Sequence, residues 1–215
     1  MPIKSKFRYR LILRLVAVAL LQIGLSACQS APGVAKSEPE PEITPAPALP
    51  APDKTADKPQ TPFEQALSDS KAGKIEQAIE QFKILQQHDP APAKVHTNLG
   101  LLYLHEKDLA LATEAFLKAI QQDKNDAIAY NHLAIIQRQQ GDFKQALFNY
   151  YKAINADPAY ANAHLNLGIL LDLYLQELPK ALEEYLKYQQ LTNNSNEDVE
   201  KWIIDLRRRI DSTKQ

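Results

Sequence analysis

The chain has 215 residues, of which 45% are hydrophobic and 24% are charged, and its formal net charge is −1. Glycine is scarce, whereas alanine, leucine, glutamine and lysine are abundant, and this composition favours helix over sheet. The single cysteine excludes an internal disulfide and a zinc site built on several thiolates. Once the five basic residues near the N-terminus are set aside, 20 basic and 26 acidic residues remain. This acidic balance argues against nucleic-acid binding.

Residues 1–27 have the layout of a bacterial secretion signal. Five basic residues, ending at Arg14, precede the apolar run LVAVALLQIGL, which spans 15–25. This run is shorter than the roughly 20 residues that a membrane-spanning helix needs. We therefore expect a removable signal peptide, and the alternative is an uncleaved anchor that buries the cysteine.

The tetrapeptide Leu25-Ser26-Ala27-Cys28 resembles the lipobox of bacterial lipoproteins. That resemblance implies that the Cys28 thiol carries a diacylglyceryl group and that Cys28 becomes the first residue of the mature chain. It also implies a membrane anchor. Gln29 follows the cysteine in place of an aspartate, which by the sorting rule of enterobacteria implies the outer membrane, facing the periplasm.

Residues 28–60 are expected to form a linker after the lipidated cysteine. Eight prolines fall within the 32 residues from 29 to 60, and large apolar side chains are almost lacking. Such a segment cannot bury enough surface to offset the entropy of ordering. An extended proline-rich chain of this length reaches up to roughly 100 Å, so it would hold a folded domain away from the membrane.

A period of 34 residues begins after Thr61. Small, aromatic and leucine columns recur at this spacing. The columns are Ala78, Ala112 and Ala146; Phe82, Phe116 and Tyr150; and Leu99, Leu133 and Leu167. This period is typical of tetratricopeptide repeats, which are helix-turn-helix units.

The clearest unit, AIAYNHLAIIQRQQGDFKQALFNYYKAINADP at 127–158, resembles the tetratricopeptide consensus. The matching positions are Tyr130, Leu133, Ala134, Gly141, Ala146, Tyr150, Ala153 and Pro158. The small residues permit two helices to cross closely, and Gly141 permits the turn between them. The resemblance implies an all-α fold: a right-handed superhelical solenoid of about four repeats plus a C-terminal capping helix.

The expected repeats span 59–92, 93–126, 127–160 and 161–195, which together form a repeat region at 61–195 after the linker. The fourth repeat needs one extra residue to keep register, and we expect a longer turn around 176–179. Residues 196–215 are expected to form an amphipathic helix that covers the end of the array. Its apolar stripe includes Trp202, which we interpret as an anchor of this cap.

No catalytic or metal site is expected. The five histidines fall on repeat positions or near helix ends, and no pair has ligand spacing beside a carboxylate. A phosphate-binding loop and a nucleophile elbow are also lacking. We therefore expect no enzyme, no cofactor, no small-molecule substrate and no metal.

The tetratricopeptide resemblance implies a concave groove lined by the first helix of each repeat. The groove residues would be Lys94, Thr97, Leu101, Leu104, Ile128, Asn131, Ile135, Arg138, Asn162, Leu165, Ile169 and Asp172. A clamp for a terminal carboxylate is not expected, because the two columns it needs hold neither its lysine nor its asparagine at the required places. The apolar column Leu101, Ile135 and Ile169 indicates either a groove for an amphipathic helix or apolar segment, or packing inside the array.

The layout of lipobox, linker and repeats resembles the pilotin lipoproteins that help secretins of type IV pili assemble. The resemblance implies a non-enzymatic, membrane-anchored adaptor in the bacterial cell envelope that binds a protein partner. Two other functions fit the same layout. One is an adaptor for peptidoglycan hydrolases or synthases, and the other is an accessory subunit of an outer-membrane protein insertion complex.

Overall fold

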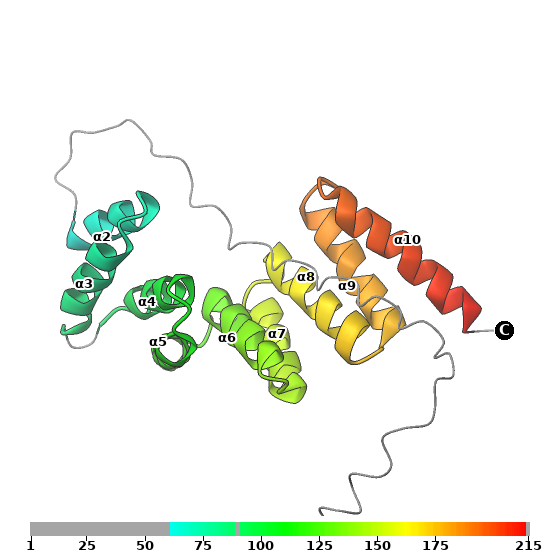
Figure 1. Cartoon of the computed structure of the whole chain (residues 1–215), viewed down its shortest axis with the longest axis horizontal. Helices are drawn as coiled ribbons and strands as arrows, with labels where there is room; N and C mark the ends of the chain where they lie inside the picture. The colour runs from blue at the N-terminus through cyan, green and yellow to red at the C-terminus, as the bar shows by residue number, and fades with distance from the viewer. Residues whose placement is uncertain (1–60, 89–90, 214–215) are drawn as a thin grey trace, which may run out of the picture. The chain divides into compact units, whose positions relative to one another are not determined.

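The computed structural model describes residues 61–88 and 91–213 (Figure 1). Every regular element in these ranges is helical, so the prediction of an all-α fold is confirmed. The signal peptide, Cys28 and the linker lie outside the described residues. The helices are α2 (Pro62–Lys71), α3 (Ile75–Gln86), α4 (Ala93–His105), α5 (Leu109–Gln122), α6 (Ala127–Gln139), α7 (Phe143–Ala156), α8 (Ala161–Ile169), the π-helical turn η1 (Leu170–Tyr174), α9 (Leu178–Leu191) and α10 (Glu197–Ser212).

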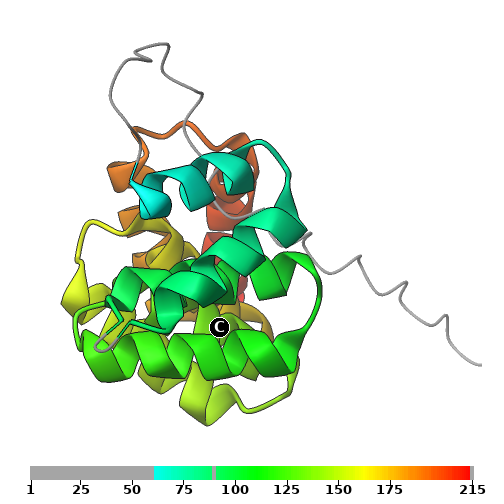
Figure 2. The same cartoon turned by 90° about the vertical axis from the view of Figure 1, so that its left-hand side faces the viewer.

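The helices pack as successive antiparallel pairs. The main contacts join α2 to α3, α4 to α5, α6 to α7, and α8 to α9, and each pair then contacts the next through α3 and α4, α5 and α6, or α7 and α8. The first helices also meet across neighbouring pairs, α2 with α4, α4 with α6, and α6 with α8. Figure 2 views the same helices from the side of the first pair. Each pair thus contacts only its neighbours, as in a solenoid.

Side chains just before the helices define where several of them begin. Thr61 forms a capping box with Glu64 at the start of α2. Asp108, Asp126 and Asp142 each accept a hydrogen bond from the amide three residues later, over 3.0, 2.8 and 3.2 Å. These carboxylates satisfy amides that lack a partner in the first turn, and their charge suits the helix dipole.

The tight turns inside the repeats require a left-handed backbone at one position. Gly73 and Gly141 occupy this position with φ of +75° and +80°, so the turn predicted at Gly141 is confirmed. Lys107 and Gln176 occupy it in the other two repeats, with φ of 61° and 55°. A side chain with a Cβ pays a conformational cost there that glycine avoids.

Small residues permit the close crossings within each pair. Ala78, Ala112, Ala146 and Ala181 are fully buried, as are the aromatic rings that follow one turn later. Gly100 packs directly against one of these rings, because a Cβ on it would lie 2.5 Å from Phe116. The repeat columns seen in the sequence are therefore packing positions between helices.

The extra residue of the fourth repeat lies in its first helix. Helix α8 runs into the π-helical turn η1, whereas three residues separate η1 from α9, the same number that separates α6 from α7. The expectation of a longer turn around 176–179 is therefore wrong. A π-helical turn accommodates one added residue within a helix without changing its ends.

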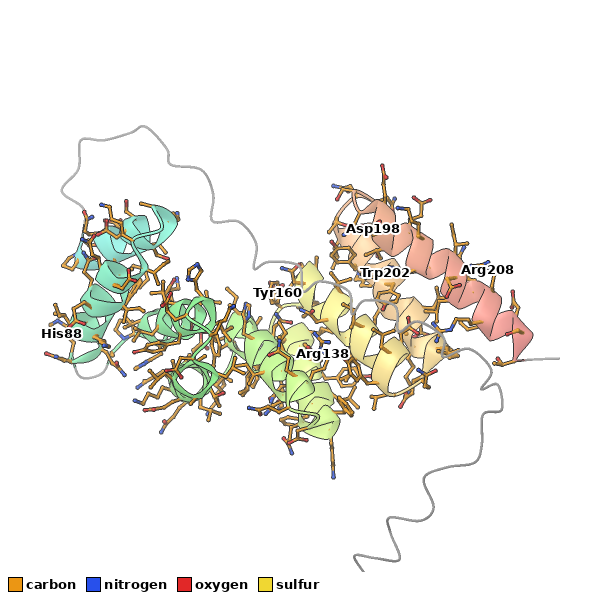
Figure 3. The ribbon with its side chains drawn as sticks, in the orientation of Figure 1. His88, Arg138, Tyr160, Asp198, Trp202 and Arg208 are labelled. Atoms are coloured by element: carbon orange, nitrogen blue, oxygen red, sulfur yellow. The ribbon has the colours of Figure 1, made fainter. Side chains whose placement is uncertain are left out.

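Helix α10 covers the last repeat. Asn196 caps it by accepting hydrogen bonds from the amides of Asp198 and Val199, over 3.1 and 3.2 Å. Val199, Ile203 and Leu206 of this helix are buried in the same core cluster as α9, and Trp202 of the predicted stripe packs half-buried against that cluster. Trp202, labelled in Figure 3, lies 5.8 Å from the Tyr185 ring between centroids, so it packs as an anchor of the cap.

Candidate functional site

The predicted groove residues all come from the first helices α4, α6, α8 and the adjoining η1, but they differ in exposure. Two are exposed: Lys94 and Ile128. Three are half-buried: Leu101, Leu104 and Asn162. Seven are buried: Thr97, Asn131, Ile135, Arg138, Leu165, Ile169 and Asp172. Only the first five can meet a partner without rearrangement of the fold.

The apolar column divides between repeats. Ile135 and Ile169 are each 8% exposed and belong to the core cluster that also contains α9 and α10. Leu101 is half-buried against the cluster formed by α5 and α6. The burial of the two isoleucines favours the alternative in which they pack inside the array, because α6 and α8 contact each other. Leu101 retains surface that a partner could cover.

Two of the buried polar residues join neighbouring repeats. The Thr97 hydroxyl donates a hydrogen bond to the Asp126 carboxylate. One period later, the Asn131 amide donates to the Tyr160 hydroxyl over 3.5 Å, and it also accepts from the Asn166 amide over 3.1 Å. Burial raises the pKa of Tyr160 to about 12, so its hydroxyl stays neutral. These groups hold the stacking register between repeats.

Arg138 and Asp172 belong to a buried polar cluster at the fourth repeat. The Arg138 guanidinium donates to the Tyr174 hydroxyl over 3.3 Å, and it lies 5.6 Å from the centroid of that ring. Asp172 pairs with Arg209 of α10, with 2.7 Å between Oδ1 and Nη1. The pKa of Tyr185, which lies beside this pair, is raised mainly by burial and secondly by the charge of the Asp172 carboxylate. The cluster connects η1 to α6 and α10, and it serves the packing of the cap.

Two of the buried histidines, His132 and His164, have structural partners. His132 stacks on Phe116, with 5.6 Å between ring centroids and an interplanar angle of 13°. His164 lies with Nδ1 2.6 Å from the Glu184 carboxylate and Nε2 3.2 Å from the Pro158 carbonyl. Within residues 61–88 and 91–213, no three His, Cys, Asp or Glu side chains gather in an arrangement that could hold a metal ion.

One surface escaped the sequence analysis. Exposed apolar side chains recur on the second helices at equivalent repeat positions, as Leu117 on α5, Tyr151 on α7 and Leu186 on α9. Phe148 lies one turn before Tyr151 and is 54% exposed. A comparison of the repeats with one another would have found Phe148, because the positions equivalent to Phe148 in the other three repeats hold glutamate.

Family comparisons agree with the helix pairing. Models described as tetratricopeptide repeat match residues 63–127 and 115–148, and one described as TPR repeat matches 136–172. The chain contains tetratricopeptide repeats. None of the curated proteins compared with it matches significantly. No helix among the residues that the structure describes is long and apolar enough to cross a membrane.

Solved structures with this fold resemble the chain at low identity. The pilF protein of Pseudomonas aeruginosa is 23% identical, with a TM-score of 0.61, and the match covers 70% of this chain and 68% of that one. MamA of Desulfovibrio magneticus is 20% identical, with a TM-score of 0.60 and coverage of 71% and 85%. The first TPR of Spaghetti (RPAP3), bound to the HSP90 peptide SRMEEVD, is 18% identical, with a TM-score of 0.51 and coverage of 55% and 92%. At these identities the likeness establishes the fold.

Proposed function

We propose that the protein is a non-enzymatic scaffold that binds another protein through its repeats. The observation that carries this proposal is the stack of helix pairs, because a solenoid of this kind presents an extended surface for binding. The tetratricopeptide domain of RPAP3, which binds a peptide, supports it at the level of the fold.

The partner surface is assigned to the accessible residues of the first helices. Ile128 is 42% exposed, and Leu101 and Leu104 add half-buried apolar area. Lys94 and Asn162 add polar groups at its edge. This mixture suits an amphipathic helix or a short apolar segment, which would bury its apolar face against the leucines and Ile128. The Thr97 hydroxyl already donates a hydrogen bond to Asp126, so Thr97 is unsuited to bind the terminal carboxylate of a partner.

The anchor and the cellular process are the finer part of the proposal. Cys28 follows a signal-like segment and precedes a proline-rich linker, so acylation would hold the repeats near a bilayer. An outer-membrane lipoprotein with this layout would serve envelope assembly, and secretin assembly in type IV pili is the first candidate. The fold shared with the Pseudomonas aeruginosa pilF protein supports that choice.

Metabolic labelling with palmitate tests the anchor. We expect label on the wild-type chain in the membrane fraction and none on a Cys28→Ala variant, which should leave that fraction. Persistence of both label and membrane association without the thiol contradicts the anchor. The scaffold is tested separately with the repeat region expressed without the anchor. In that protein, Ile128→Lys should abolish capture of the secretin while thermal unfolding stays unchanged.

A further inference from the structure

The third repeat breaks a pattern that the other three keep on their second helices. Glu80, Glu114 and Glu183 occupy equivalent positions once the extra residue of η1 is counted, and Phe148 holds that position in α7. Glu114 pairs with Lys118 one turn later, over 2.8 Å. In α7 the lysine is kept as Lys152, but its ammonium lies 5.3 Å from the centroid of the Phe148 ring. An exposed aromatic has therefore replaced a surface carboxylate.

Phe148 lies within a longer row of exposed apolar side chains. Leu117, Tyr151 and Leu186 are 52%, 40% and 41% exposed, and they occupy equivalent positions on α5, α7 and α9. We call these four residues the outer apolar row. Exposed single apolar residues are ordinary, but apolar side chains that recur at the same position on the second helix of three repeats, with two aromatics in the row, are typical of an interaction surface.

The charged side chains of α7, which lie beside this row, are all basic. This helix contains Lys144 and Lys152 and no acidic residue. Phe148 lies one turn from each lysine, on the exposed side of the helix. On two other second helices, α5 and α9, Lys118 and Lys180 have carboxylate partners at 2.8 and 2.5 Å. Within the described residues neither lysine of α7 takes part in an ion pair, so both ammonium groups are available to an incoming anion.

We propose that the exposed face of α7 binds a narrow acidic segment of a partner protein. Carboxylates of the segment meet Lys144 and Lys152, and an apolar side chain between them covers Phe148 and Tyr151. The aromatic pair supplies the area that a partner buries, and the two lysines supply orientation. This surface lies on a second helix, so it is separate from the first-helix surface assigned above and does not depend on the anchor.

The surroundings favour a protein segment over an anionic bilayer. Burial raises the pKa of Tyr151. The carboxylates of Glu184, Glu177 and Glu183 raise it further and Lys180 lowers it, so three acids and one lysine act on this aromatic side chain. A flat anionic membrane would meet these carboxylates together with the lysines and be repelled by them. A narrow segment lying along α7 brings its carboxylates to Lys144 and Lys152 and places only its apolar side chain beside Tyr151 and these acids.

Fluorescence anisotropy with defined probes tests the proposal. The first probe is a labelled peptide in which glutamates flank a central Leu-Phe pair, and the second carries lysines in place of the glutamates. Vesicles of phosphatidylglycerol and phosphatidylethanolamine form the third. The protein is the wild-type chain, and Phe148→Glu is the main variant because it restores the residue found in the other repeats. Phe148→Ala is a second variant that removes the ring without adding charge.

We expect the acidic peptide to bind the wild-type chain, and Phe148→Glu or the double variant Lys144→Glu/Lys152→Glu to weaken binding by about tenfold or more. Lys124→Glu removes an exposed lysine before α6 and should leave the affinity unchanged. Circular dichroism and urea midpoints confirm folding, and Phe148→Ala carries the test if Phe148→Glu fails to fold. Equal binding of both peptides, no binding of the acidic peptide, insensitivity to Phe148, or binding of vesicles alone overturns the proposal.

Discussion

Acid should weaken the fold through His132. Its ring stacks on Phe116, and burial lowers its pKa from 6.5 to about 4. The folded chain therefore keeps this imidazole neutral at pH 5, whereas the unfolded chain binds a proton there. Because the unfolded state binds more protons, stability is complete above pH 6.5 and falls as the pH drops from 6.5 towards 4.

The size of the effect follows from the two pKa values. Linkage between an unfolded pKa of 6.5 and a folded pKa of about 4 removes about 2 kcal/mol of the free energy of unfolding between pH 7 and pH 5. With a urea slope of about 2 kcal/mol/M, the unfolding midpoint should fall by about 1 M from this residue alone. His96, whose pKa is also lowered by burial, acts in the same direction.

The matched variant is His132→Asn. Asparagine occupies the equivalent positions in the neighbouring repeats, as Asn98 and Asn166. Urea unfolding of both proteins at pH 7 and pH 5 should show a lower stability of the variant at pH 7, because the stacking is lost, and a pH-dependent drop smaller by about 2 kcal/mol. An equal drop in both proteins, or an NMR titration that protonates His132 above pH 6 in the folded state, refutes the reasoning.

Four other outcomes are expected. Gly100→Ala should lose about 1–3 kcal/mol in urea unfolding, because its Cβ would lie 2.5 Å from Phe116, and normal stability would contradict that crossing. Lys107→Gly should gain about 0.5–1 kcal/mol by relieving its φ of 61°, while a loss would show that its side chain matters more than its backbone. Arg209→Ala should cost about 1–2 kcal/mol by leaving the buried Asp172 without this arginine, whereas Arg208→Ala at an exposed pair should cost under about 0.5 kcal/mol. Equal costs would refute a stabilising role for the pair of Asp172 and Arg209. Hydrogen bonds from Gln65, Gln81 and Lys74 lower the pKa of Asp69 from 3.8 to about 2, so this carboxylate stabilises the fold above pH 4. In Asp69→Asn the free energy of unfolding should therefore depend less on pH between pH 4 and 2. An unchanged pH profile would contradict the assignment.

The repeat architecture could be predicted because each period contains its own packing constraints. The positions of Ala146 and Tyr150 hold small and aromatic residues in every repeat, because every helix pair must cross at the same distance. The location of the extra residue in η1 could not be predicted in the same way. A single insertion fits either a turn or a π-helical turn, and the repeat columns on either side are in register in both cases.

The candidate site was predictable only in part. The 34-residue spacing identifies which residues lie on the first helices. How deeply each one is buried depends on contacts between repeats and with α10. Asp172 illustrates this, because Arg209, its partner, lies in the cap and has no fixed repeat spacing to it. Ile135 is likewise buried by neighbouring helices that the single-repeat pattern does not describe. The accessible surface had to be read from the assembled helices.

Quantitative mass spectrometry of the detergent-solubilised membrane fraction tests the scaffold most directly. The tagged full-length protein would be purified in parallel with Ile128→Lys, after matched expression and a check of folding. One envelope protein recovered in near-stoichiometric amount with the wild type, and lost with the variant, is the expected result. Recovery of the protein from the soluble fraction without acyl chains contradicts membrane attachment. Recovery of the same co-purifying proteins with the wild type and with the variant contradicts binding through the first helices.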